Sequence, residues 1–231
     1  MAQVEQLFEQ VRAMVRGCPD PMMATALIRA AREFCQQTQF IRRTVSFNTV
    51  ANVSQYNLTP ANCTGLNPSE EVIGLRHWQI QTPGTNGQTQ PGVFPYGTQV
   101  NPNWTPSQPW CLNYIPEGIV QLSPTPDQAY VVQPEVVVQP QLASVWIPDE
   151  LLRRFDRALG YGALSWIHGQ GGNQPGDQNP YYNEAKAAKN LLLFNAEIAR
   201  GRRAAQNDFT PAPRSWVHRP YAAGGRRGGR R

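Results

Sequence analysis

The hydrophobic pattern of the chain changes twice along its length, and this change limits the possible folds more than any other feature. Apolar residues recur at helical spacing in residues 3–38 and again in residues 147–206, which is typical of amphipathic helices that bury one face. In residues 40–146 this spacing is absent, and short runs of β-branched and aromatic residues alternate with clusters of Pro, Gly, Asn and Thr. The chain is therefore predicted to contain two helical segments separated in sequence by a β-rich segment.

The N-terminal segment predicts a helical hairpin. One amphipathic helix is expected over residues 3–16 and a second over residues 20–38. At the start of the second helix, Asp20 offers a capping oxygen and Pro21 suits the first turn. The interruption between the two helices is short, so we expect them to lie antiparallel.

A second pair of helices is expected over residues 147–168 and 180–206, on either side of a loop rich in Gly, Gln and Asn. Residues 191–194 are apolar nearly all round their turn, so the last helix is predicted to be buried on more than one side. The apolar stripes of the two helix pairs need each other to be buried, which favours a four-helix assembly. The residues expected on packed helix faces, either in the core or between subunits, are Phe155, Leu159, Ala163, Leu191, Phe194 and Ile198.

The central segment predicts a small β domain with long loops. It holds eight charged residues and no Lys. Its loops at residues 82–92 and 101–108 exceed the usual connection length of about 4–6 residues, so they are expected to be functional or to be ordered by a partner. The expected strands cover residues 41–47, 71–80, 110–114, 118–122 and 130–138.

Together these patterns predict an α+β fold, in which a four-helix assembly carries an inserted small β domain and an extended C-terminal arm. The expected boundaries are 1–39 for the N-terminal helical hairpin, 40–146 for the β-rich domain, 147–206 for the C-terminal helical hairpin and 207–231 for the arm.

Charge is concentrated at the C-terminal end of the chain. From Arg200 onward there are nine Arg and a single acid, Asp208, which makes +8. The whole chain carries +5, so residues 1–199 carry −3. Aromatic residues are spaced among the arginines of the arm, which is typical of an extended segment that binds another surface with aromatic anchors and a basic rim. The residues expected to bind a partner protein are Phe209, Arg214, Trp216, Arg219, Tyr221, Arg226 and Arg227.

Two other interpretations of the arm stay open at this point. Its arginines could contact nucleic-acid phosphates, with an affinity that falls steeply with salt. Alternatively, the arm could be a solubilising tail with no specific role. The aromatic residues favour docking on a protein, because buried aromatic side chains are typical of interfaces.

The sequence contains no pattern that indicates catalysis. A phosphate-binding loop, a nucleophile elbow and a zinc-protease motif are all absent. His77, His168 and His218 are far apart in the sequence and no C-x-x-C pair accompanies them, so structural or surface roles are expected for each. The chain is therefore predicted to be no enzyme and to need no cofactor or metal.

The same inspection finds neither a secretion leader at the N-terminus nor a run of about 18 apolar residues, so no membrane span is expected. In a reducing compartment the cysteines are expected to be buried free thiols rather than disulfides. These are Cys18, Cys35, Cys63 and Cys111.

The order of the elements and four strings in the helical segments resemble the head-to-tail adaptor proteins (gatekeeper or tail tubular proteins) in the necks of short-tailed bacteriophages, the podoviruses. The resemblance covers residues 1–210 in the order of their elements. The strings are LIRAAREFC at residues 27–35, IPDELL at 147–152, ALGYGAL at 158–164 and NAEIAR at 195–200.

This resemblance implies a structural protein of the virion neck, assembled in the host cytoplasm. It implies a ring, typically of twelve copies, beneath the portal protein, with the helices as the ring wall and the arm reaching onto the portal. The β domain would face the tail nozzle or tail fibres, and double-stranded DNA would pass through the lumen during ejection. A nucleic-acid-binding protein that acts through its Gly/Arg tail and a different ring-forming virion component are the alternatives.

Overall fold

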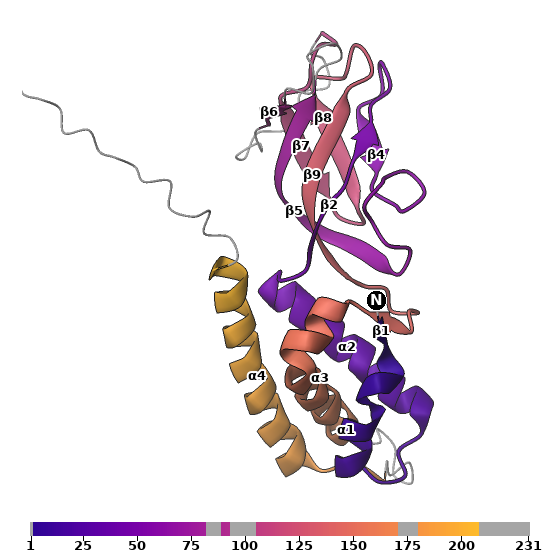
Figure 1. Ribbon diagram of the computed structural model, residues 1–231, viewed down its shortest axis with the longest axis vertical. Coiled ribbons are helices and arrows are strands. Elements are labelled where there is room, and N and C mark those ends of the chain that lie inside the picture. Colours follow the sequence, from indigo (N-terminus) through magenta and orange to yellow (C-terminus); the bar gives the residue numbers. More distant parts are fainter. Residues whose placement is uncertain (1, 82–88, 93–104, 171–179, 208–231) are drawn as a thin grey trace, which may run out of the picture.

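The computed structural model describes residues 2–81, 89–92, 105–170 and 180–207. Figure 1 shows an elongated molecule, with the α-helices gathered at one end and most of the β-strands at the other. The predicted α+β class is therefore confirmed. One continuous group of buried apolar side chains runs through both parts of the molecule.

The N-terminal helical segment begins with strand β1 (Ala2–Gln3) and a 3-10 turn, η1 (Val4–Leu7), before helix α1 (Phe8–Met14). The single helix expected over residues 3–16 is therefore a 3-10 turn followed by a short α-helix. Helix α2 (Asp20–Thr38) has the expected extent. The expectation that Asp20 caps it is wrong, because Pro19 occupies the cap position and the Asp20 carboxylate accepts a 2.6 Å bond from Arg12.

The C-terminal helical segment consists of α3 (Asp149–Gly169) and α4 (Glu184–Asn207). Helix α4 begins four residues later than expected. The reason is local: the side-chain oxygen of Asn183 accepts a 2.9 Å bond from the backbone N–H of Lys186, which is the geometry of a helix N-cap. Helix α3 is kinked at Phe155, whose φ of −138° lies outside the helical range.

Small residues let α2, α3 and α4 approach closely. A Cβ atom added at Gly162 of α3 would lie 2.7 Å from Cβ of Ala30 and 3.0 Å from the ring of Phe194. One added at Gly201 of α4 would lie 2.6 Å from the ring of Phe34. Both glycines are therefore required by packing between helices rather than by backbone conformation.

The larger sheet is antiparallel and is built around β9 (Val131–Pro140), which pairs with β2 (Arg42–Thr44), β3 (Phe47–Asn48) and β5 (Glu70–Gln81). The short β6 (Thr89–Pro91) adds to the other edge of β5. The pairing of β5 with β9 runs from Glu70 opposite Pro140 to Gln81 opposite Val131 and contains two irregularities.

A smaller antiparallel sheet has the order β4 (Gln55–Asn57), β8 (Ile119–Ser123) and β7 (Cys111–Ile115). Its buried residues, such as Leu112 and Leu122, share a core with Trp78 and Val132 of the larger sheet. Each of the five expected strand segments contains an observed strand. The polar β4 and β6 were not expected, and neither was β10 (Trp146–Ile147), which pairs with β1.

Candidate interaction surfaces

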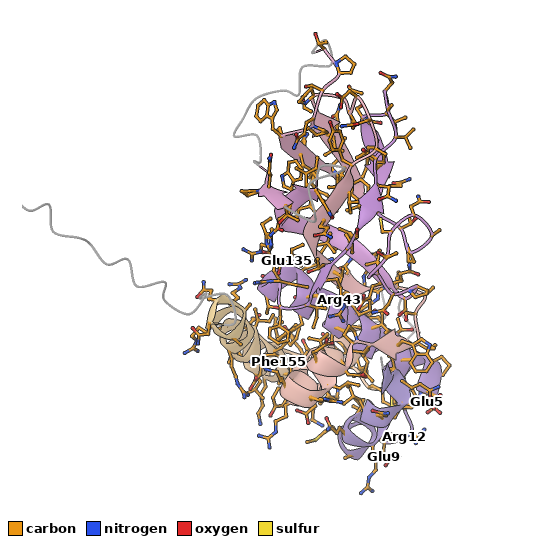
Figure 2. The ribbon with its side chains drawn as sticks, turned by 45° about the horizontal axis from the view of Figure 1, so that its top comes forward. Glu5, Glu9, Arg12, Arg43, Glu135 and Phe155 are labelled. Atoms are coloured by element: carbon orange, nitrogen blue, oxygen red, sulfur yellow. The ribbon has the colours of Figure 1, made fainter. Side chains whose placement is uncertain are left out.

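Charged side chains join the helical part to the β part. Arg43 on β2 contacts Glu70 on β5 at 3.0 Å and Glu150 at the start of α3 at 3.1 Å. The Glu70 side chain is fully buried and also accepts a 3.0 Å bond from Asn67. Because a buried carboxylate needs a charged or hydrogen-bonding partner, this cluster is required by the fold. Figure 2 places Arg43 where the strands meet the helices.

A second cluster reinforces the same junction from α2. Arg32 donates a 2.7 Å bond to Glu71 on β5 and another of 2.7 Å to the backbone oxygen of Pro140 on β9. Gln139 also contacts the Glu71 carboxylate. The two acids that would otherwise resemble a catalytic pair, Glu70 and Glu71, are therefore each engaged by an arginine.

The pKa of Glu150 is shifted by this junction. Partial burial raises the pKa, but hydrogen bonds and charge from Arg43 outweigh that effect, so the pKa lies below its ordinary value. The ionised form of Glu150 is thus favoured in the folded protein.

A hollow of about 610 Å³ lies between β5 and the turn that joins β7 to β8. Its lining includes Glu70, Glu71, Tyr114 and Glu117. Burial raises the pKa of Tyr114, and its hydroxyl donates to the backbone oxygen of Val72. Three of these four groups are therefore held by bonds within the fold.

Other groups that could carry chemistry are also buried in structural roles. Burial raises the pKa of all four cysteine thiols, which disfavours the reactive thiolate. His168 is buried and its Nδ1 lies 2.7 Å from the backbone oxygen of Tyr181. Among the described residues no three His, Cys, Asp or Glu side chains gather as metal ligands.

Helix α4 packs on α2 and α3 through one narrow stripe. Phe194, Ile198, Gly201 and Ala205 are buried on that stripe. Most other residues of the helix are exposed, and Leu192 is 72% exposed. The expectation that residues 191–194 are buried on more than one side is therefore wrong for the single chain.

The residues expected on packed helix faces divide accordingly. Five of them lie in the core of the chain, and Leu191 is 44% exposed on α4. Its neighbour Leu193 is also exposed. We call Leu191, Leu192 and Leu193 the leucine turn. The five core residues are Phe155, Leu159, Ala163, Phe194 and Ile198.

A second exposed apolar surface lies beside the N-terminus. Leu142 and Val145, in the segment that connects β9 to β10, and Trp146 of β10 are exposed. The backbone N–H of Val4 donates a 3.1 Å bond to the oxygen of Val145, which holds this segment against η1. Sequence reasoning missed this surface, because its residues follow no periodic pattern and become neighbours of η1 only through the pairing of β1 with β10.

The arm residues expected to bind a partner lie outside the residues that the structure describes. These are Phe209, Arg214, Trp216, Arg219, Tyr221, Arg226 and Arg227. In the described residues, none of the helices is both long enough and apolar enough to span a membrane.

Comparison with curated proteins finds none that matches this chain. A family model described as SU10 adaptor protein matches residues 3–216, a range that includes all the helices, nearly all the strands and the first residues of the arm. The match supports the expected role as a phage head-tail adaptor, while the gatekeeper and short-tailed-phage assignments stay predictions. Because the match covers nearly the whole chain, this protein belongs to the SU10 adaptor protein family.

Proposed function

We propose that this protein is a ring-forming structural subunit of the virion neck, which links the portal to the tail and forms part of the channel for DNA ejection. The observation that carries the ring is the leucine turn on α4. Three consecutive leucines, exposed by 44%, 72% and 37%, are unusual on the surface of a single chain whose other helices bury most of their apolar residues. Exposed apolar patches of this kind mark protein interfaces.

Family membership supplies the partners of the proposal. An adaptor between head and tail contacts a portal protein on one side and a tail component, a nozzle or fibre protein, on the other. Twelve copies is the expected number, and the arm with Phe209, Trp216 and Tyr221 is the proposed portal contact. The junction charges support a rigid connection between the helical and β parts, since Glu70 and Glu71 are both bonded to arginines.

The test is assembly with the portal protein of the same virion. Full-length protein and a variant ending at Asn207 are each mixed with purified portal and examined by negative-stain electron microscopy and sedimentation velocity. The full chain is expected to form a ring on the portal. The truncated chain should unfold at the same denaturant concentration but fail to dock.

Two results would contradict this proposal. If the full chain stays monomeric with the portal and with every tail component, it is no ring-forming adaptor. If the truncated chain docks as tightly as the full one, the arm is not the portal contact.

The arginines of the arm favour one alternative, binding of nucleic acid through the Gly/Arg tail. It predicts that the full chain shifts duplex DNA in a gel and that this binding weakens steeply between low and high salt. The same truncation at Asn207 would abolish the shift. Tight DNA binding without portal docking would favour this alternative over the adaptor.

A further inference from the structure

We infer that the ring closes through contact between two different surfaces, the outward face of α4 on one copy and the N-terminal flank of the next. The N-terminal flank consists of η1, α1, the segment that connects β9 to β10, and β10 itself. This inference rests on the proposed function, because it specifies the subunit interface of the proposed ring.

The outward face of α4 is suited to contact another protein. It presents the leucine turn, and Ala188 and Ala185, one and two turns earlier, are also exposed. Small side chains next to large ones allow a second element to approach the helix backbone closely and to surround the leucines. The residues of α4 that are buried within its own chain lie on another stripe, which contains Phe194 and Ile198.

The charge of α4 indicates what that partner carries. The helix holds five basic and two acidic residues, so its net charge is +3. Lys186 and Lys189 are exposed and flank the turn of Ala188. A partner with exposed acids beside apolar residues is the complement of such a surface.

The N-terminal flank has these properties. Its elements η1 and α1 contain two acids, Glu5 and Glu9, and one arginine, Arg12, which contacts Glu9 at 3.2 Å, so together they carry −1. Glu5 and Glu9 are exposed one helical turn apart, and the Glu9 side chain is 84% exposed. In Figure 2 both glutamates lie at the edge of the molecule.

The flank also offers an apolar surface for the leucines. Leu142 and Val145 are exposed by 57% and 58%, and Trp146 by 38%. They lie beside the start of η1, since Val145 accepts a bond from the N–H of Val4. A partly exposed tryptophan among aliphatic residues is typical of an interface anchor.

The placement of the two surfaces favours a ring over a dimer. In both views α4 lies on one side of α2 and α3, and η1 with α1 lies on the other. Two copies joined in this way still present one free α4 and one free flank, so further copies add head to tail until the rotation closes. Pairing of α4 with α4 would stop at two copies and would bring like charges together.

The interface can be mapped directly with a photo-crosslinking amino acid at position 192. The variant is assembled with the portal protein, irradiated and analysed by mass spectrometry. Crosslinks to residues 2–20 or 142–147 of another copy are the expected result. Crosslinks confined to α4 or to the portal would overturn the inference, although a ring seen by microscopy would leave the proposed function standing.

Charge reversal provides a second test with its own rescue. The double variant Glu5→Lys/Glu9→Lys and the double variant Lys186→Glu/Lys189→Glu are each expected to lose the ring on the portal. Combining all four changes should restore it, because each altered surface again meets the opposite charge. If all three variants assemble like the wild type, the inference is wrong.

A mixing experiment separates two unlike surfaces from one self-complementary surface. Leu192→Asp damages α4 alone, and its loss of association should be about 30-fold, which corresponds to about 2 kcal/mol for a central interface residue. The Leu192→Asp variant is then mixed with the Glu5→Lys/Glu9→Lys variant. The first variant keeps an intact N-terminal flank and the second keeps an intact α4, so the two can bind each other through these surfaces. Pairs of the two variants, but no rings, are expected by sedimentation.

The matched control is Val50→Asp, because Val50 is 59% exposed in the β part and lies on neither surface. It should assemble with the portal as the wild type does.

If the wild type itself forms no ring with the portal, the proposed function fails, and the inferred interface fails with it. Circular dichroism of each variant establishes that it remains folded.

Discussion

Helices α3 and α4 are neighbours of similar length, yet they differ in how much of their surface is buried within the chain. Helix α3 is buried at ten positions, contacts α1, α2 and α4, and is tied to the β part through Glu150. Helix α4 is buried at four positions and packs mainly on α2 and α3. The comparison indicates that α3 holds the chain together, whereas α4 covers it on one side and leaves the other available for contact with a partner.

The sharpest test of this difference compares two residues of α4 itself. Phe194→Ala should lower the free energy of unfolding by about 3–5 kcal/mol, because the ring is 1% exposed and fills the space beside Gly162. Leu192→Ala should change stability by no more than about 0.5 kcal/mol, since the side chain is mostly exposed. Urea denaturation followed by fluorescence measures both.

Equal losses for the two variants would contradict the distinction between the two faces of α4. A large loss for Leu192→Ala alone would mean that the outward face is covered within the chain.

A second prediction concerns two glycines of α3 that are two residues apart. Gly162→Ala should destabilise by about 1–3 kcal/mol, because the added Cβ would lie 2.7 Å from Cβ of Ala30. Gly160→Ala should stabilise by about 0.5–1 kcal/mol, since the nearest atom to its added Cβ is the Gln10 side-chain oxygen at 3.6 Å and alanine favours the helix. Thermal unfolding of both variants gives the comparison.

Opposite signs for the two glycine variants are the expected outcome. If Gly162→Ala proved neutral or stabilising, α3 would pack less closely against α2 and α4 than the structure indicates.

The smallest expected effect concerns the link between α3 and the β part. The pKa of Glu150 is lower in the folded protein than in the unfolded chain, so its contribution to stability is present above the unfolded pKa and is lost as pH falls through the folded pKa. The side chain is 49% exposed, so solvent screening limits the contribution to about 0.5 kcal/mol. Unfolding of wild type and Glu150→Gln, measured between pH 7 and pH 3, tests it.

The two stability profiles should differ at neutral pH and converge in acid, where Glu150 is protonated. A difference between the profiles that grows as pH falls would have the wrong sign and would assign the effect to another group.

The sequence predicted the helices well because their signal is local. The spacing of Met23, Leu27, Ala31 and Phe34 is enough to indicate one buried face, and all four are buried in α2. The long strands β5 and β9 were also expected from their β-branched residues. The short strands β4 and β6 were missed, because Gln55–Asn57 and Thr89–Pro91 are polar and become strands only where β8 and β5 offer a free edge.

The candidate surfaces were predicted less completely than the fold. Leu191 was identified as a contact residue from its apolar surroundings. The N-terminal flank, on the other side of the molecule, was not identified as a contact surface. Nothing in the local sequence connects Glu5 with Trp146, which lie more than a hundred positions apart and are brought together by the pairing of β1 with β10. The portal-docking residues of the arm stay a prediction.

By itself, therefore, the sequence determined which segments are helical, the change to β structure in the middle of the chain, the basic arm and the likeness to the adaptor family. Tertiary structure alone decided which apolar residues of α4 turn inward. Phe194 and Leu192 are equally hydrophobic candidates, and the choice between them depends on where Gly162 leaves room for a ring. The choice depends on how segments that are distant in sequence fit together in space. The spacing of apolar residues along one helix does not contain that information.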